Sequence, residues 1–106
     1  DLVKTCIQED KLPDAMFTTN NFATIGFMKA IIEENMQIGK DIRCVSFDYL
    51  DFADVLGLNL SYVGRHENMG ELACRMLIDR IANPKLPRRT EIVQPHLVLK
   101  GSELKK

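Results

Sequence analysis

Apolar residues in the first half of the chain follow two patterns, helical spacing and short continuous runs. Helical spacing predicts that residues 1–10 are the middle or end of a helix. It also predicts a helix at 22–35, with an apolar stripe wide enough to pack on a sheet. Short apolar runs predict strands at 14–19 and 42–47. The run at 42–47 shows little alternation, which favours a parallel strand covered on both faces.

The second half of the chain continues this succession of elements. The predicted elements are a short helical turn at 52–56, strands at 58–63, 90–93 and 96–99, a long amphipathic helix at 67–82 and a polar tail at 101–106. Strands and helices therefore alternate along most of the chain. This order predicts an α/β sandwich built on a parallel sheet.

Composition narrows the classes of function. Of the 106 residues, 14 are basic and 15 acidic, so the formal net charge is −1. Proteins that coat a nucleic acid duplex carry a clear basic excess, so we expect no unaided binding of nucleic acid. Hydrophobic residues make up 45% of the chain, which is enough for a packed core. No apolar run approaches the roughly 20 residues that span a bilayer, so we expect no membrane partner.

Side chains that could catalyse a reaction or hold a metal are few and scattered. His66 and His96 lie far apart in the sequence, and a metal site needs more ligands. Cys6, Cys44 and Cys74 lie on apolar faces without a CxxC pair, which is typical of small core residues. No nucleophile elbow, phosphate loop, zinc-protease or dinucleotide motif occurs. We therefore expect no enzyme, metal or cofactor, and the missing elbow counts against a small α/β hydrolase.

Polar side chains follow two of the predicted strands. Asn20 and Asn21 follow the strand at 14–19, and Asp48 follows the strand at 42–47. If the two strands are neighbours, Asn20 and Asp48 face one crevice at the carboxyl edge of the sheet, where open α/β sheets bind ligands. An amide and a carboxylate together suit the hydroxyls of a polyol. The alternative is that Asn20 or Asn21 caps a helix and Asp48 starts a turn.

Three long segments carry extended motifs. Residues 13–31 are PDAMFTTNNFATIGFMKAI, residues 39–63 are GKDIRCVSFDYLDFADVLGLNLSYV, and residues 67–102 are ENMGELACRMLIDRIANPKLPRRTEIVQPHLVLKGS. In the same order and with close spacing, they resemble PDAIFATNDxxAxGxxxAL, PxDISVVGFDDxxxxxxxxPxLTTV and xxMGxxAxxLLLxRIxxPxxPxxxxxxxPxLVxRxS. These are segments of the LacI/GalR family of bacterial transcriptional regulators.

The resemblance implies a larger protein. Members of the family begin with a helix-turn-helix headpiece and a hinge helix, followed by a two-lobed effector domain. The implied fold is a type I periplasmic-binding-protein-like one, a three-layer α/β/α parallel sheet, of which this chain is an incomplete fragment from the last third. Residues 1–63 would belong to the C-terminal lobe, residues 64–92 to the N-terminal lobe, and residues 93–106 to the C-terminal lobe again.

The resemblance also implies a function in which no covalent bond is made or broken. We expect the effector-binding and dimerisation part of a cytoplasmic regulator, which senses a sugar or a nucleobase-like metabolite and forms a homodimer. Operator DNA would bind only through the headpiece, which is absent here. The alternative is a periplasmic sugar-binding protein of a transport system, which shares the fold, although the final segment favours the regulator.

Three candidate effector-binding residues come from the resemblance. Asn20 matches the Asn of the family's ND pair, and Asp48 matches the first Asp of GFDD; both positions commonly bond the effector. Arg65 lies near the crossover after LTTV, which often supplies another polar contact. The crossover VGRHEN is about one residue shorter than the usual form.

Three departures from the family's pattern leave the effector open. Asn21 replaces the usual Asp, Ser46 replaces the Gly of GFDD, and Tyr49 replaces its second Asp.

Two apolar surfaces are also expected. In the family, the segment after GFDD helps to form the subunit interface. That role is suited here by the apolar residues Leu50, Phe52, Val55 and Leu56. The alternative is that they pack in the local core. The helix at 67–82 would expose its apolar Met69, Leu72 and Met76 face without the rest of its lobe. A stable form would then need a partner chain.

Overall fold

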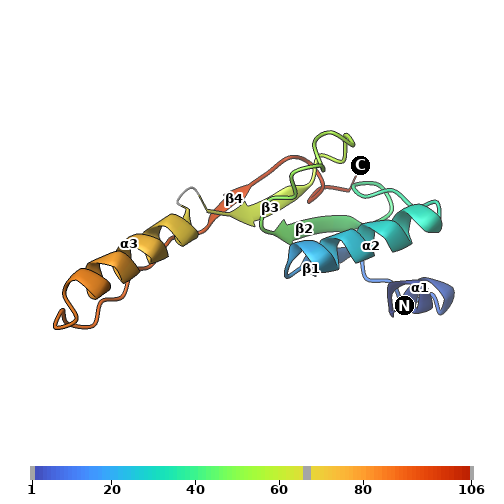
Figure 1. Ribbon diagram of the computed structural model, residues 1–106. Coiled ribbons are helices and arrows are strands. Elements are labelled where there is room, and N and C mark those ends of the chain that lie inside the picture. Colours follow the sequence, from blue (N-terminus) through green and yellow to red (C-terminus); the bar gives the residue numbers. More distant parts are fainter. Residues whose placement is uncertain (1, 66–67, 106) are drawn as a thin grey trace. The chain divides into compact units, whose positions relative to one another are not determined.

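The computed structural model describes residues 2–65 and 68–105. The elements, in order, are α1 (Leu2–Gln8), β1 (Ala15–Thr18), α2 (Asn21–Glu33), β2 (Arg43–Phe47), β3 (Ser61–Gly64), α3 (Met69–Ala82) and β4 (His96–Val98) (Figure 1). The chain forms two compact units. Unit 1 comprises Asp1–Gly64 and Leu97–Lys106, and unit 2 comprises Arg65–His96. The assignment of these units to the two lobes of the family stays a prediction.

The four strands form one sheet in the order β1-β2-β3-β4. β1 and β2 are parallel, with Met16 opposite Cys44 and Thr18 opposite Ser46. β2 and β3 are also parallel. The predicted parallel pairing is therefore confirmed for β1, β2 and β3, and β1 and β2 are neighbours, as the expected crevice requires.

α2 forms because its start is capped and one of its faces is apolar. The Asn20 side chain accepts a hydrogen bond from the Ala23 backbone N–H at 2.8 Å, which satisfies one of the free donors of the first turn. The helix lies against β1 and β2 (Figure 1). Its Phe27, Met28 and Ile31 side chains are buried in the core. Burial of each such side chain contributes about 1.5–3 kcal/mol.

The sheet of unit 1 is covered by a helix on one face. The Thr18 hydroxyl lies 2.7 Å from that of Thr24 on α2, so Thr18 points toward the helix. Side chains alternate along a strand, so Phe17 points away, and it is 53% exposed. Val45 and Phe47 of β2 share its face and are half-buried. Among the described residues α2 is the helix that contacts the strands, so the prediction that β2 is covered on both faces is wrong for this chain.

Two sequence-based boundaries differ from the structure. The strand expected at 58–63 starts only at Ser61, and the strand expected at 90–93 does not form. Residues 90–92 are exposed and pair with no strand, so their backbone N–H and C=O groups have no ladder to join. The turn expected at 52–56 is present within 51–57 and ends at Gly57, whose φ of +66° favours glycine.

The segment expected to be a polar tail is instead part of the core of unit 1. Ser102 is only 3% exposed. Its hydroxyl accepts from the Ser61 backbone N–H at 2.7 Å and donates to the Cys44 carbonyl at 2.6 Å. Its backbone carbonyl accepts from the Cys44 N–H at 2.9 Å, and its N–H donates to the Asn59 carbonyl. Ser102 therefore satisfies backbone groups near the amino ends of β2 and β3 that would otherwise be buried without partners.

Unit 2 consists of α3 and the segment that follows it. The Asn68 side chain caps α3 by accepting from the Glu71 N–H, and Arg80 donates to the carbonyls of Leu86 and Pro87, which holds the following segment beside the helix. No described residue of α3 is buried. Met69 is exposed, whereas Leu72 and Met76 are half-buried, so the expected apolar face is only partly uncovered within unit 2.

The Ser102 contacts generate a stability prediction. Ser102→Ala removes the hydroxyl and leaves the buried Ser61 N–H without an acceptor, so the free energy of unfolding should fall by about 1–3 kcal/mol. Urea unfolding of the purified protein measures the change. Thr90→Ala, at an exposed position, is the control and should have no effect. Equal stability of the Ser102 variant and the unaltered protein would contradict the role given to this hydroxyl.

Candidate functional site

The candidate site lies where β1 and β2 end. Because the two strands are parallel neighbours, their carboxyl ends lie at the same edge of the sheet, and Asn20 and Asp48 follow these ends by one or two residues. The expected placement of these two residues at one sheet edge is therefore confirmed. Such an edge is where open α/β sheets bind ligands.

Asn20 has a structural role and a free donor. Its side-chain oxygen caps α2, as the alternative interpretation expected, and its backbone carbonyl accepts from both the N–H and the hydroxyl of Thr24. The residue is exposed, and its amide nitrogen has no partner among the described residues. The cap therefore fixes the side chain and, within the described part of the chain, leaves its N–H groups available to a ligand.

Asp48 is held in an unusual backbone conformation. Its φ is +71°, in the left-handed region that only Gly, Asn and Asp adopt with any frequency. Its N–H donates to the Val63 carbonyl at 2.8 Å, and its carbonyl accepts from the Ser46 hydroxyl at 3.1 Å. These bonds tie the residue to the ends of β2 and β3, so its half-buried side chain starts from a fixed backbone.

Two departures from the family's pattern contact each other. The Asn21 amide nitrogen donates to the Tyr49 carbonyl at 3.3 Å. A carboxylate has no hydrogen to donate, so an Asp at position 21 could not make this bond. The Asn21 side-chain oxygen is buried without a partner among the described residues. Sequence reasoning noted both departures but not their contact, for which spacing alone gives no signal.

Arg65 lies in unit 2. One of its guanidinium nitrogens donates to the Met69 sulfur at 2.7 Å. The structure places Asn20 and Asp48 in unit 1, where they follow neighbouring strands, whereas Arg65 belongs to unit 2. Its effector-binding role stays a prediction.

The expected interface residues divide into two groups. Leu50 is 4% exposed and packs in the core, so local packing is the correct interpretation for this residue. Phe52, Val55 and Leu56 are 42%, 85% and 60% exposed. We call these three side chains the loop patch.

The three cysteines differ in burial. Burial raises the pKa of Cys44 to about 11, against a smaller lowering by its hydrogen bond with Thr18, so the thiol stays protonated at neutral pH. Cys6 is half-buried, and Cys74 is exposed on α3, so the core role expected for Cys74 is wrong within this chain.

The part of the chain that the structure describes contains no group of three His, Cys, Asp or Glu side chains that could hold a metal ion. His96 is exposed at the start of β4, and His66 lies outside the described residues. Within the same residues, no helix has the length and apolar character needed to cross a membrane.

Comparison with known proteins identifies the fold. A sequence profile of the periplasmic binding protein-like domain matches residues 2–102. The chain belongs to this domain family. Similar curated proteins include the ribose operon repressor of Escherichia coli, 27% identical over 96% of this chain and 31% of that protein, and the repressor MelR of Bacillus subtilis, 30% identical over 86% and 27%. The chain thus spans about three tenths of the length of these relatives.

Solved structures of this domain family agree with that result. A LacI-family repressor structure from Corynebacterium glutamicum superposes with a TM-score of 0.79 at 28% identity, over 94% of this chain and 39% of that one. A LacI-family regulator from Enterococcus faecium with bound ribose superposes with a TM-score of 0.83 at 17% identity, over 97% of this chain and 40% of that one. The periplasmic-binding-protein-like fold and the resemblance to the LacI/GalR family are confirmed.

The capping bond of Asn20 generates a prediction about the stability of the protein. Asn20→Ala removes the oxygen that accepts from the Ala23 N–H, so the free energy of unfolding should fall by about 1 kcal/mol. Asn20→Asp keeps that oxygen and should keep the stability. Urea unfolding measures both, with Thr19→Ala at the adjacent exposed position as control. A loss of stability in the Asp variant equal to that in the Ala variant would contradict the capping role.

Proposed function

We propose that this chain is the effector-binding and dimerisation part of a LacI-type transcriptional regulator that senses a sugar or a related small metabolite. The observation that carries the proposal is the position of Asn20 and Asp48 at one carboxyl edge of a parallel sheet with this domain's fold. The repressor relatives support it, as does the ribose bound in a structure of the same fold.

The chemistry of the two side chains suits a polyhydroxylated ligand. The Asn20 amide supplies donors, and a carboxylate at position 48 supplies acceptors for hydroxyl hydrogens. Arg65 would add further donors, as its match to the family's crossover suggests. A nucleobase presents donors and acceptors of the same kind, so it is the second class of effector to test.

Regulation would follow from lobe closure. An effector that binds one arrangement of the lobes more tightly shifts the population toward it, and a headpiece attached to the lobes would change its affinity for operator DNA. No step makes or breaks a covalent bond, so the proposed sensor has no enzymatic activity. It would act in the cytoplasm, because it controls binding to operator DNA. A periplasmic sugar-binding protein is not favoured, because the named relatives are repressors.

Dimerisation would use the loop patch. Its three apolar side chains lie exposed on one turn, and exposed apolar groups of this kind are typical of subunit contacts. Phe22 on the first turn of α2 is also exposed, and the adjacent Asn21 bonds to the Tyr49 carbonyl just before the patch. We therefore propose a homodimer whose contact includes the loop patch.

Asp48→Asn tests the effector site. Asn tolerates the positive φ of this position, so the substitution removes the charge without straining the backbone. A hydrogen bond to a charged group contributes about 1.5–3 kcal/mol, so the effector Kd should rise at least about tenfold. Isothermal titration calorimetry of the gene product, with ribose first and then a panel of sugars and nucleosides, measures the change.

The control for this test is Asp51→Asn, which removes an exposed carboxylate from the adjacent loop. Unchanged affinity in the Asp48 variant would remove Asp48 from the site. If no compound of the panel binds and none alters the affinity for operator DNA, the sensor function itself is wrong.

Val55→Asp tests the dimer. Val55 is 85% exposed, so the charge should leave the fold of the subunit intact. In a dimer it would be buried without a partner, so the dimer Kd should rise at least about tenfold. Sedimentation velocity over a range of concentrations measures this, and Leu2→Asp, at another exposed apolar position, is the control. A dimer as tight as that of the unaltered protein would exclude the loop patch from the contact.

A further inference from the structure

A compact cluster of charged and aromatic side chains includes Asp54, which directly precedes Val55 of the loop patch. The Lys100 Nζ donates to both carboxylate oxygens of Asp54, at 2.7 and 2.6 Å, and the Tyr49 hydroxyl donates to the same carboxylate at 3.1 Å. The Lys100 ammonium also lies 5.5 Å from the centre of the Tyr49 ring and 5.9 Å from that of Tyr62. The two rings are 5.1 Å apart, centre to centre. We call these four residues the Lys100 cluster.

The Lys100 cluster is better organised than an ordinary surface ion pair. Exposed pairs contribute little because both side chains move freely in water. Here the Lys100 side chain is only 26% exposed, whereas Lys11, which pairs with Glu9, is 72% exposed. The carboxylate also accepts three hydrogen bonds, and their effect lowers the pKa of Asp54 while the pKa of Lys100 is raised, mainly by its bonds to Asp54. Both groups are therefore charged at neutral pH.

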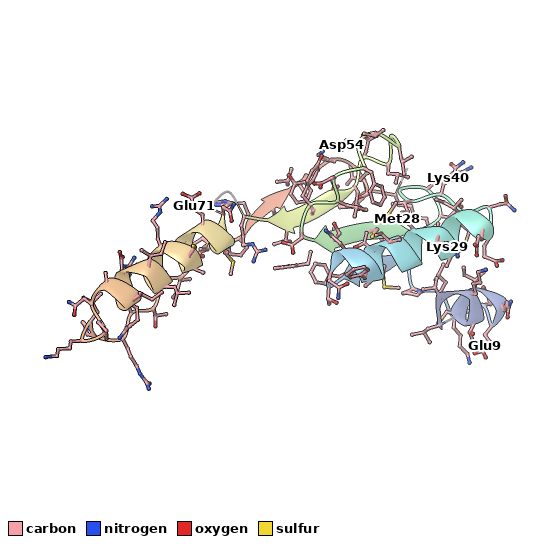
Figure 2. The ribbon with its side chains drawn as sticks, in the orientation of Figure 1. Glu9, Met28, Lys29, Lys40, Asp54 and Glu71 are labelled. Carbon is pink, nitrogen blue, oxygen red and sulfur yellow. The ribbon has the colours of Figure 1, made fainter. Side chains whose placement is uncertain are left out.

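The position of Asp54 in the loop gives the pair its importance. Asp54 lies on the loop between β2 and β3 (Figure 2), directly before Val55 and Leu56 of the loop patch. Leu50 and Ala53 hold this loop from inside, since both are buried in the core. The bond to Lys100 holds it from outside, by joining it to the segment after β4.

We propose that the ion pair between Asp54 and Lys100 positions the loop patch, so that association of two subunits depends on this pair. The inference rests on the proposed dimer and adds to it the residues that hold its contact surface in place. Asp54 and Lys100 are positioning residues, because the contact itself is made by the apolar side chains.

One member of the Lys100 cluster, Tyr49, is a departure from the family's motif. Tyr49 stands where the family's motif has a second Asp, and a carboxylate there would place a second negative charge near Asp54 in place of a hydroxyl donor. Tyr49 also directly follows the candidate effector residue Asp48, and its carbonyl accepts from Asn21. The residue that completes the Lys100 cluster is therefore joined to the candidate effector site through the backbone.

Sedimentation velocity of the gene product at low ionic strength tests the proposal. Lys100→Met and Asp54→Asn should each raise the dimer Kd roughly tenfold, since each dimer contains the pair twice. Lys100→Arg keeps a cation that can bond both carboxylate oxygens and stack on the rings, so it should retain a tight dimer. Lys11→Met, which breaks the exposed pair with Glu9, is the matched control and should have no effect.

The salt dependence of the dimer Kd distinguishes loss of the ion pair from a general loss of structure. Added NaCl should weaken the dimer of the unaltered protein and have a smaller effect on Lys100→Met, whose pair is already absent. Unchanged dimerisation in Lys100→Met and Asp54→Asn, alongside a loss in Val55→Asp, would overturn the positioning role and leave the proposed interface intact. If Val55→Asp also dimerises normally, the interface is wrong and the positioning role is excluded with it. Loss in Lys100→Arg equal to that in Lys100→Met would likewise overturn it.

Discussion

The packing of α2 on β1 and β2 is the interaction on which the rest of unit 1 depends. It buries Phe27 and Ile31, and it places the Thr24 hydroxyl against Thr18 at the end of β1. A helix that starts directly after a strand and lies on its face must turn sharply at the strand's carboxyl end. Asn20 stands at that turn, so the contact that stabilises the core also determines where the candidate ligand-binding side chain begins.

The candidate site therefore shares residues with the scaffold. The side-chain oxygen of Asn20 stabilises α2, while its amide nitrogen has no partner among the residues that the structure describes. The backbone of Asp48 joins the ends of β2 and β3. Such sharing pre-organises the side chains, because their backbones cannot move without breaking bonds of the fold. It also restricts change. A new effector specificity at position 48 has to come from residues that accept a positive φ, chiefly Asn and Gly.

Much of this fold could be predicted from local patterns, because helical and strand spacing reflect which face of each element is buried. The pattern could not find the role of Ser102, since its partners Ser61 and Cys44 lie 41 and 58 residues away. It also could not separate Leu50 from Val55, because an apolar residue in a turn points inward or outward according to tertiary contacts. The apolar pattern predicts a strand at 90–93, but a strand forms only where a neighbouring strand can pair with it.

The candidate site was predictable in a different way. The sequence predicts polar side chains at the carboxyl ends of β1 and β2, and the family resemblance selects Asn20 and Asp48 among them. The strand ends and the resemblance gave no indication that Asn21 bonds to Tyr49 or that Asp54 bonds to Lys100. Each contact involves residues at which this chain differs from the family's motif, or positions at which the motif names no residue. Contacts made by such residues become visible only when the chain is folded.

The bonds of Ser102 also determine when unit 1 can be completed during protein synthesis. Ribosomes add about 5–20 residues per second, so about 3–12 s separate the synthesis of Cys44 from that of its partner 58 residues later. In that interval the amino ends of β2 and β3 lack the group that joins them. Until residue 102 is available, the Cys44 carbonyl and the Ser61 N–H lack the hydroxyl that they bond in the fold, so the junction of the two strands stays incomplete.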